Sequence, residues 1–276
     1  MLRKNSDLFP RGHVDLERFK KLISTGKPFT FIRFSDGEIE ILRNRRLVIS
    51  SGVTEFRGKT FSNNFPKFDE KSFNPKDGQA LRADLLASAI YREDSYFKGV
   101  PTAHNNAVID REFMLRLNGG LTSQLTFSDL FLNSNFLMAR TNFFPFAVEY
   151  FSSIFLVGNW RCTLGKYLSG ATLVPIPDNL FATYEKTLGD VLLQIRESPK
   201  YSLVLSSASS LSNILGHRLR IERPDITFLD IGTALNDIMG LPGKTRAYHK
   251  LLDQLTFSEK ISAWRYKRNK EYQLKW

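Results

Sequence analysis

The 276-residue sequence contains a single cysteine, Cys162. One thiol cannot close an intramolecular disulfide, and it rules out a metal site that needs several cysteine ligands. We expect Cys162 to be a small, buried or half-buried side chain, as free cysteines usually are. A chain without disulfides suits a reducing compartment, so we expect a cytoplasmic protein.

Long hydrophobic runs are also missing. The apolar stretches at 143–148 and 154–157 are far shorter than the roughly 20 residues that a membrane-spanning helix requires. The first six residues carry charge and no apolar run follows them, so we expect no secretory signal peptide. With 42% hydrophobic residues and no repeat, the chain has material for one large α/β domain or two small ones.

Histidine is scarce, and the motifs of several enzyme classes are absent. The four histidines show no spacing typical of metal ligands, and His104, in the loop after Pro101, is the best placed for catalysis. The sequence has no Gly-x-Ser-x-Gly, no Walker loop and no His-Glu-x-x-His. These absences disfavour the hydrolase and nucleotide-binding chemistries that the motifs serve.

Positive charge, in contrast, is abundant. The 39 Lys and Arg exceed the 28 Asp and Glu and give a formal net charge of +11. A surplus of this size favours polyanionic partners, which include phosphorylated ligands, nucleic acid and anionic membrane surfaces. The charge by itself does not choose among them.

Short apolar runs alternate with segments of helical periodicity. Runs rich in aromatic and β-branched residues predict strands at 29–34, 96–101, 154–157, 171–176, 201–205 and 226–231. Apolar residues at helical spacing predict helices at 15–26, 79–92, 109–117, 146–151, 164–168, 180–196 and 214–219. Asp15 is the expected N-cap of the first helix, residues 39–42 suggest a short helix or turn, and the polar segment 51–78 suggests a long loop or lid.

This order of elements predicts an α/β fold. Strands separated by helices of this length form βαβ units and a mostly parallel sheet with flanking helices. In such sheets ligands bind beyond the carboxyl ends of the strands. The residues that directly follow each predicted strand are therefore the first candidates for a functional site.

The most informative segment is 31–38, Phe-Ile-Arg-Phe-Ser-Asp-Gly-Glu, at the end of the first predicted strand. Its two carboxylates, Asp36 and Glu38, suit a hard divalent cation such as Mg²⁺ or Mn²⁺. Gly37 between them allows the backbone to turn sharply or to approach a ligand closely. Arg33 could bind phosphate through two hydrogen bonds.

The same segment has a second interpretation. Ser35-x-x-Glu38 matches a capping box for the helix that follows, and spacing alone does not decide between a cap and a metal site. Arg33 is harder to explain as a purely structural residue, because a half-buried guanidinium within an apolar strand needs an anionic partner.

Segment 31–38 resembles the Arg-x-Gly-Asp-Gly-Glu signature of the GT-D-fold glycosyltransferases, a Rossmann-like family with an Asp-x-Glu metal motif. Ser35 stands here where that family usually has glycine. Further resemblances follow in the family's order over residues 20–241, at 137–141, 155–159, 177–181 with Tyr184, 203–208 and 228–232. Segment 206–210 is a run of serines and one alanine where the family usually has a glycine-containing loop.

The resemblance implies a single Rossmann-like glycosyltransferase domain over 1–259, followed by a basic aromatic segment at 260–276. It implies a nucleotide-sugar donor, most simply a UDP-sugar, and a cell-surface glycan or glycoprotein as acceptor. Asp36 and Glu38 would hold Mn²⁺ or Mg²⁺ against the donor diphosphate and take part in catalysis. The implied donor-binding residues are Arg33, Ser35, Gly37, Arg140, Ser206 and Ser207.

Two further carboxylates end predicted strands. Asp178 and Asp230 could each act as a general base or bind a ribose, or could simply cap the next helix. The serines at 206–210 have a similar alternative, since small hydroxyl side chains bind phosphate but also cap helices. We keep both possibilities open at each position.

Segment 260–276 interleaves cations with Trp264, Tyr266, Tyr272 and Trp276. It suggests an interfacial membrane segment, a nucleic-acid patch, or a solvated helix whose aromatic residues pack on the domain. Peripheral contact with an anionic membrane agrees best with a lipid-linked acceptor, and nucleic acid is the less favoured partner. The rival to an enzyme is a non-catalytic module that binds nucleic acid or an anionic surface.

Overall fold

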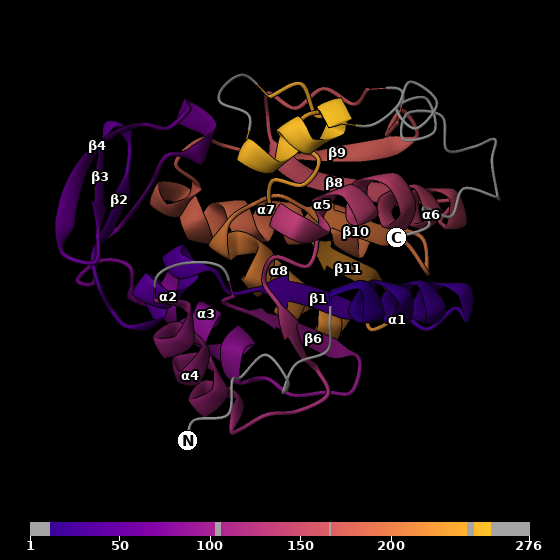
Figure 1. The fold of residues 1–276 in the computed structure, drawn as a ribbon, viewed down its shortest axis with the longest axis horizontal. Coiled ribbons are helices and arrows are strands. Elements are labelled where there is room, and N and C mark those ends of the chain that lie inside the picture. Colours follow the sequence, from indigo (N-terminus) through magenta and orange to yellow (C-terminus); the bar gives the residue numbers. More distant parts are fainter. Residues whose placement is uncertain (1–11, 103–105, 166, 242–245, 255–276) are drawn as a thin grey trace.

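A seven-stranded parallel sheet runs through the centre of the structure (Figure 1). The computed structural model describes residues 12–102, 106–165, 167–241 and 246–254. The strand order is β7-β6-β1-β11-β10-β8-β9, and every neighbouring pair is parallel. The strands are β1 (Thr30–Arg33), β6 (Tyr96–Val100), β7 (Leu125–Phe127), β8 (Ile154–Asn159), β9 (Ala171–Ile176), β10 (Leu203–Ser206) and β11 (Thr227–Asp230).

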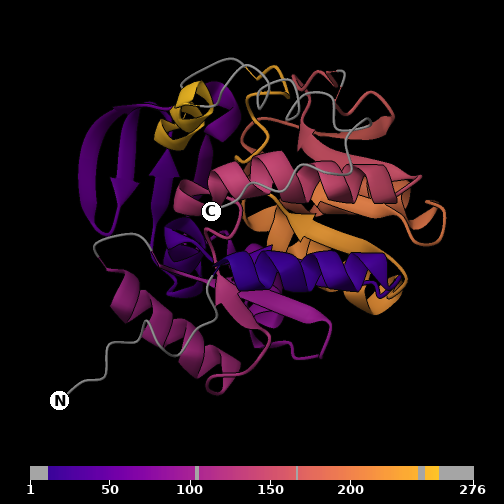
Figure 2. The ribbon, with the colours of Figure 1, turned by 45° about the vertical axis from the view of Figure 1, so that its right-hand side comes forward.

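Helices cover both faces of this sheet. The helices are α1 (Gly12–Ser24), α2 (Asp36–Leu42), α3 (Gln79–Ile90), α4 (Ala107–Asn118), α5 (Phe136–Met138), α6 (Phe144–Tyr150), α7 (Tyr184–Arg196) and α8 (Ser210–Glu222). Side chains alternate along β1, so Phe31 joins the core under α1 and α6, whereas Ile32 joins the core under α3, α7 and α8. Figure 2 shows α1 and α6 side by side on their face. The expected single α/β domain with a parallel sheet is confirmed.

The first helix forms as its spacing predicts, but it begins earlier. Leu16, Phe19 and Ile23 lie on one buried stripe of α1. The helix starts at Gly12, so Asp15 lies in its first turn and is not the N-cap. The Asp15 carboxylate instead accepts a hydrogen bond from Thr126 Oγ1 at 2.5 Å, which ties α1 to β7.

The prediction of a long loop or lid at 51–78 is wrong for most of that segment. Residues 47–73, called the insert below, form an antiparallel sheet in the order β4-β3-β2-β5. Its strands are β2 (Leu47–Ile49), β3 (Ser51–Phe56), β4 (Lys59–Asn64) and β5 (Lys71–Phe73). The two-residue turn between β3 and β4 has positive φ at Arg57 and Gly58, 53° and 69°, the backbone that tight hairpins require.

Two smaller expectations also fail. The described residues of 164–168 form no helix, and the backbone N–H of Leu168 bonds to the carbonyl of Gly165. Glycine within so short a segment disfavours a helix, while Leu168 is buried in the core regardless. The three-residue strand β7 has no counterpart among the predicted strands, since its pattern is too short to recognise.

Some sequence-based proposals lie outside the described residues: His104, and the basic aromatic segment 260–276. Within the part that the structure describes, no helix has both the length and the apolar character to traverse a bilayer.

Candidate active site

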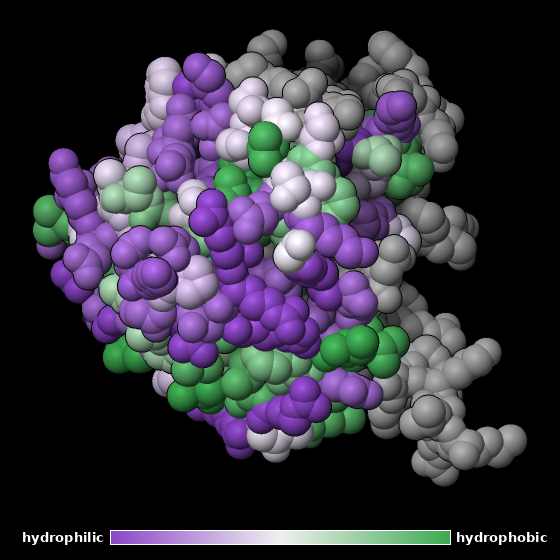
Figure 3. All heavy atoms as spheres, turned by 90° about the vertical axis from the view of Figure 1, so that its left-hand side faces the viewer, coloured by the Kyte–Doolittle hydropathy of each residue, from purple (hydrophilic) through white to green (hydrophobic). Residues whose placement is uncertain are grey.

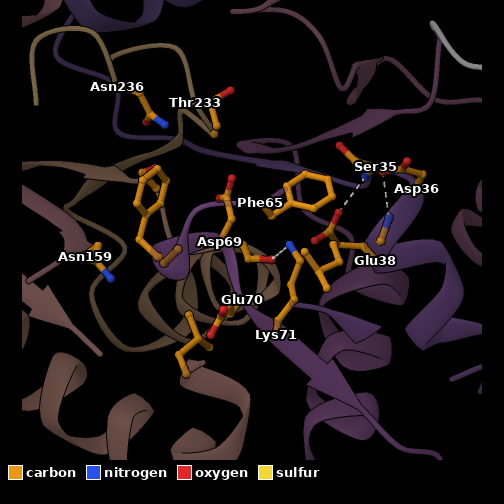
Figure 4. Close-up of a pocket in the computed structure, with 18 of the residues that line it drawn as sticks. Ser35, Asp36, Glu38, Phe65, Asp69, Glu70, Lys71, Asn159, Thr233 and Asn236 are labelled. Carbon is orange, nitrogen blue, oxygen red and sulfur yellow. Dashed lines mark hydrogen bonds between the residues drawn. The ribbon is translucent and has the colours of Figure 1, made fainter. Parts of the chain in front are cut away.

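A cleft of about 600 Å³ lies at the carboxyl edge of the large sheet. The neighbouring strands β1 and β11 end there, at Arg33 and Asp230. In Figure 4 the turn that carries Ser35, Asp36 and Glu38 lies on one side of the cleft, and Asn159 lies on the other. The insert and the segment after β11 complete the walls. Ligands of parallel sheets bind beyond this edge.

Arg33 and Asp230 form an ion pair in the floor of the cleft. Arg33 Nε lies 3.4 Å from Asp230 Oδ1, and the two side chains are 12% and 5% exposed. Arg33 Nη1 also donates to the carbonyl of Ser128 at 2.9 Å. Gly232 makes room for the guanidinium, because its φ is +50° and a Cβ there would lie 2.4 Å from Arg33 Nη2. Asp230 is therefore the anionic partner that Arg33 needs.

The Asp230 carboxyl has an unusual environment for proton transfer. Its pKa is raised to about 6, mainly by burial; the Arg33 guanidinium opposes this rise and the nearby Glu38 carboxylate adds to it. The backbone N–H of Gly232 donates to Asp230 Oδ1 at 3.0 Å and fixes its orientation. A carboxyl group with a pKa near neutrality can hold or release a proton in the physiological range.

Glu38 serves as the cap that its spacing predicts and also faces the cleft. Its Oε2 accepts a hydrogen bond from the Ser35 backbone N–H at 3.1 Å, as in a capping box. Its Oε1 accepts a hydrogen bond from Ser210 Oγ at 2.9 Å, so both oxygens have protein partners. Asp36 is exposed on the cleft wall, and its Oδ1 accepts a local bond from the Gly37 N–H at 3.0 Å.

Asp36 and Glu38 fit a divalent cation that takes most of its ligands from substrate and water. Each oxygen of Glu38 keeps a lone pair besides the one that accepts its hydrogen bond, and Asp36 is open to the cleft. Among the described residues no group of three or more carboxylate, imidazole or thiol side chains could form a closed metal cage. Mg²⁺ and Mn²⁺ commonly bind in this open manner, through one or two carboxylates and substrate phosphates.

The serine-rich loop between β10 and α8 separates into buried and cleft-facing residues. Ser206 is fully buried and its hydroxyl pairs with Ser212 Oγ at 2.8 Å, so it does not line the cleft. Ser207 does line the cleft, together with Ser209. Ser209 has φ of +51°, a left-handed conformation that normally favours glycine, at the start of α8. The loop thus adopts a glycine-like backbone without glycine.

The insert contributes charged residues that sequence reasoning assigned to a loop. Lys71, the first residue of β5, donates a hydrogen bond to Ser209 Oγ at 2.8 Å. Asp69 accepts a hydrogen bond from Arg246 at 3.3 Å, and Glu70 accepts one from the Ser51 N–H at 3.1 Å. The signal that could have located them is the hairpin turn at Arg57–Gly58 between two runs rich in aromatic and β-branched residues.

The insert also gives the cleft an aromatic wall. Its phenylalanines in the lining are Phe56, Phe61, Phe65 and Phe68. Phe61 is 46% exposed, which leaves a large apolar face in contact with solvent. Figure 3 shows that the face of the molecule on this side is largely hydrophilic, with apolar side chains gathered mainly along its lower part. An aromatic wall beside a charged floor suits a ligand with one polar and one apolar part.

Arg140 lies outside the cleft lining. Its side chain is 1% exposed, and its Nη2 and Nε lie 3.1 Å and 3.3 Å from Asp237 Oδ2. The guanidinium also lies over the ring of Tyr167, 5.1 Å from the centroid. These contacts hold the segment after β11 against the short helical turns at 136–143, a structural role.

Asp178 follows β9 but is likewise absent from the cleft lining. It accepts a hydrogen bond from Asn159 Nδ2 at 2.8 Å and pairs with Arg161. The Arg161 guanidinium lowers the pKa of Asp178, which keeps this carboxyl ionised. Asn159, its neighbour, does face the cleft.

Neither His217 nor His249 lines the cleft. His217 is buried on α8, where its ring centroid lies 4.9 Å from that of Tyr91. Burial lowers the pKa of His217. His249 Nε2 lies 3.1 Å from the carbonyl of Thr233, a cleft residue, and burial lowers its pKa as well. Both are neutral packing residues at physiological pH.

The fold is similar to that of a structure described as a new glycosyltransferase (DUF1792) from Streptococcus sanguinis. The TM-score is 0.53 at 16% sequence identity, and the match covers 87% of this chain and 90% of that chain. A selenomethionine-substituted structure of domain of unknown function 1792 matches with a TM-score of 0.51 and 14% identity, over 87% of this chain and 92% of that chain.

No protein-family model matches the sequence, and no curated protein matches it. At 16% identity or less the likeness is one of fold, and it extends over nearly all of both chains. The chain therefore has the GT-D glycosyltransferase fold that segment 31–38 and its companion segments imply.

Proposed function

We propose that this chain is a glycosyltransferase that moves a sugar from a nucleotide-diphosphate donor to a glycan or glycoprotein acceptor. The observation that carries the proposal is the placement of Asp36, Glu38 and Asp230 around one cleft at the carboxyl edge of the sheet. The fold of the DUF1792 structures supports the same class of enzyme. The Asp-x-Glu resemblance supports a UDP-sugar as donor.

Each residue has a distinct proposed task. Asp36 and Glu38 would hold Mn²⁺ or Mg²⁺, which when bound supplies positive charge to the departing diphosphate. Glu38 would be oriented for this by Ser35 and Ser210, its two hydrogen-bond donors. Asp230 is the candidate general base, because its pKa of about 6 lets it accept a proton near neutral pH.

The remaining residues of the proposed donor site would bind the donor or support the residues that do. Arg33 brings a guanidinium to the cleft floor, where its charge would favour the anionic donor even though Asp230 partly neutralises it. Ser207 and the start of α8 supply hydroxyl and backbone donors, which suit phosphate at a helix N-terminus. Ser206 and Arg140 would act only by supporting the residues that line the cleft.

The charges of the cleft disfavour the rival function as a binding module for nucleic acid. The described lining carries five carboxylates against three cations. The carboxylates are Asp36, Glu38, Asp69, Glu70 and Asp230. A polyanion would be repelled by such a surface, whereas a divalent cation with a diphosphate would complement it.

We further propose that the chain acts at the cytoplasmic face of a membrane, with segment 260–276 in peripheral contact. The basis is the alternation of cations and aromatic residues in that segment, which favours an anionic interface. The acceptor on such a surface would be lipid-linked.

A donor-hydrolysis assay tests the proposal directly. The purified chain is incubated with UDP-sugars in Mn²⁺ or Mg²⁺, and released UDP is measured with and without EDTA. We expect slow release that stops when the chelator is added and resumes when metal is restored. Failure to bind or turn over any nucleotide sugar would reject the proposal, and turnover unaffected by EDTA would reject its metal-dependent form.

A further inference from the structure

Lys71 is a cation of the cleft that pairs with no carboxylate among the residues that the structure describes. Three cations line the cleft in the part of the chain that the structure describes. Arg33 pairs with Asp230, and Arg246 pairs with Asp69. Lys71 Nζ donates to the neutral hydroxyl of Ser209, and no ion pair joins it to a carboxylate of the described residues.

The surroundings of Lys71 explain why an anion would bind there. The side chain is half-buried, and a partly desolvated ammonium group is stabilised by a negative partner. An ammonium group has three donors, and Ser209 Oγ takes one of them. The neighbouring Glu70 carboxylate bonds instead to the Ser51 N–H on β3. The remaining donors of Lys71 are therefore available to a ligand in the cleft.

The fold fixes Lys71 beside the proposed metal ligands. On β5, side chains alternate, so Lys71 and Phe73 share a face; Phe73 is 1% exposed in the core and anchors the strand. Lys71 contacts Ser209, and the next residue, Ser210, contacts Glu38. Figure 4 shows Lys71 on the same side of the cleft as Glu38.

We infer that Lys71 binds the diphosphate of the donor, so that the insert supplies part of the donor site. The inference rests on the proposed function. In the free protein Ser209 holds the ammonium group in place, and on donor binding the phosphate oxygens become its principal partners. Lys71 would then stabilise the nucleoside diphosphate as it leaves, in addition to the charge supplied at Asp36 and Glu38.

The test is calorimetric titration of UDP and UMP, each with Mn²⁺, into four variants and the wild type. Lys71→Met removes the charge, Lys71→Arg keeps it, and Ser209→Ala removes the protein partner alone. Lys59→Met is the matched control, because Lys59 is an exposed lysine of the same insert that does not line the cleft. Melting temperatures are measured for all five proteins.

We expect Lys71→Met to weaken UDP binding by about tenfold or more, the effect of losing one charge-assisted hydrogen bond. UMP, which lacks the second phosphate, should lose about twofold or less. Lys71→Arg should recover most of the affinity for UDP, Lys59→Met should bind it as the wild type does, and Ser209→Ala should lose less affinity than Lys71→Met. This pattern would support a ligand role.

Three results would overturn the inference. If Lys71→Met binds UDP as tightly as the wild type, Lys71 is not a donor ligand, and the proposed function stands without it. If Lys71→Met and Ser209→Ala weaken UDP binding equally, the hydrogen bond between Lys71 and Ser209 serves only to hold the insert against α8. If the wild type binds no nucleoside diphosphate of uracil, guanine, adenine or cytosine, the proposed function and the inference fail together.

Discussion

Arg33 and Asp230 are brought together by two strands that are adjacent in the sheet but almost 200 residues apart in the chain. Their ion pair places a guanidinium and a carboxyl group in the floor of the same cleft, 3.4 Å apart. The pair holds each group in position, and Arg33 limits the rise in pKa that burial causes, so that the pKa of Asp230 is about 6. Several expected outcomes rest on this arrangement.

The first prediction concerns pH. Since Asp230 must be ionised to accept a proton, turnover should fall about tenfold per pH unit below pH 6, its folded-state pKa. Asp230→Asn should lose most activity and show no such acidic limb. A pH–rate profile of the two proteins checks this, with Asp178→Asn as the control outside the cleft. An unchanged acidic limb in Asp230→Asn would contradict the assignment.

The same shift predicts the effect of Asp230 on stability. Its pKa of about 6 in the folded state lies above the ordinary value of 3.8, so the folded protein binds the proton more tightly. The contribution of Asp230 to folding therefore becomes less favourable as pH rises from about 4 to 6. For Asp178, whose folded pKa is lowered, stability is instead lost as pH falls. The difference in unfolding free energy between the wild type and each Asn variant, measured by urea denaturation from about pH 3 to pH 7, should show these opposite slopes.

The second prediction concerns Gly232. A methyl group there would overlap Arg33 Nη2 and impose a positive φ on alanine. Gly232→Ala should displace the guanidinium, lower activity by about tenfold or more and destabilise the protein by about 1–2 kcal/mol. Gly170→Ala is the matched control, because a Cβ at Gly170 meets open space. Equal activity in both variants would show that the position of Arg33 does not matter.

The third prediction separates Arg140 from the donor site. Removing its charge leaves Asp237 partly buried without its partner, which should cost on the order of 3 kcal/mol of stability. Arg140→Met should therefore melt earlier, while the folded enzyme keeps its KM for the donor. Kinetics well below the melting temperature check this. A large rise in KM with unchanged stability would instead support the donor-binding role that the resemblance implies.

The fourth prediction concerns segment 260–276. Replacing its six Lys and Arg residues with Ser should weaken binding to anionic liposomes by about 1 kcal/mol for each cation near the surface. Donor turnover in solution should stay nearly constant. Vesicles of neutral phosphatidylcholine are the control. An equal loss of soluble activity would mean that the segment belongs to the active site or to the fold.

The sequence predicts the central strands of the large sheet well because they are buried on both faces. Such strands are continuous apolar runs, as in 154–157 and 203–205. The position of Asp36 and Asp230 at one edge follows from parallel strand order and is confirmed in the structure. These features depend on local pattern alone.

The insert could not be predicted in the same way, since its strands mix apolar with polar residues and pair only locally. A hairpin turn of Arg57–Gly58 carries a weaker signal than Asn-Gly, and the polar segment resembles a loop. Lys71 was missed for this reason. The partner of Arg140 was missed for a different reason. Asp237 is almost 100 residues away in the chain, and no local pattern identifies such a contact.

Asp36 and Glu38 carry the central claim, and their substitutions should differ in one respect. Glu38→Gln disturbs the bonds to Ser35 and Ser210, so it should cost about 1 kcal/mol of stability. Asp36 is exposed on the cleft wall, so Asp36→Asn should leave the melting temperature nearly unchanged. Both changes remove an anionic oxygen from a hard-cation site.

The most direct measurement is donor turnover by Asp36→Asn as Mn²⁺ is titrated, beside the wild type and with melting temperatures recorded. A metal site predicts a fall of about a thousandfold at low Mn²⁺, equivalent to about 4 kcal/mol of lost leaving-group stabilisation, in a protein that melts like the wild type. It also predicts partial recovery at high Mn²⁺. Full activity in Asp36→Asn, or in wild type stripped of metal, would contradict the account.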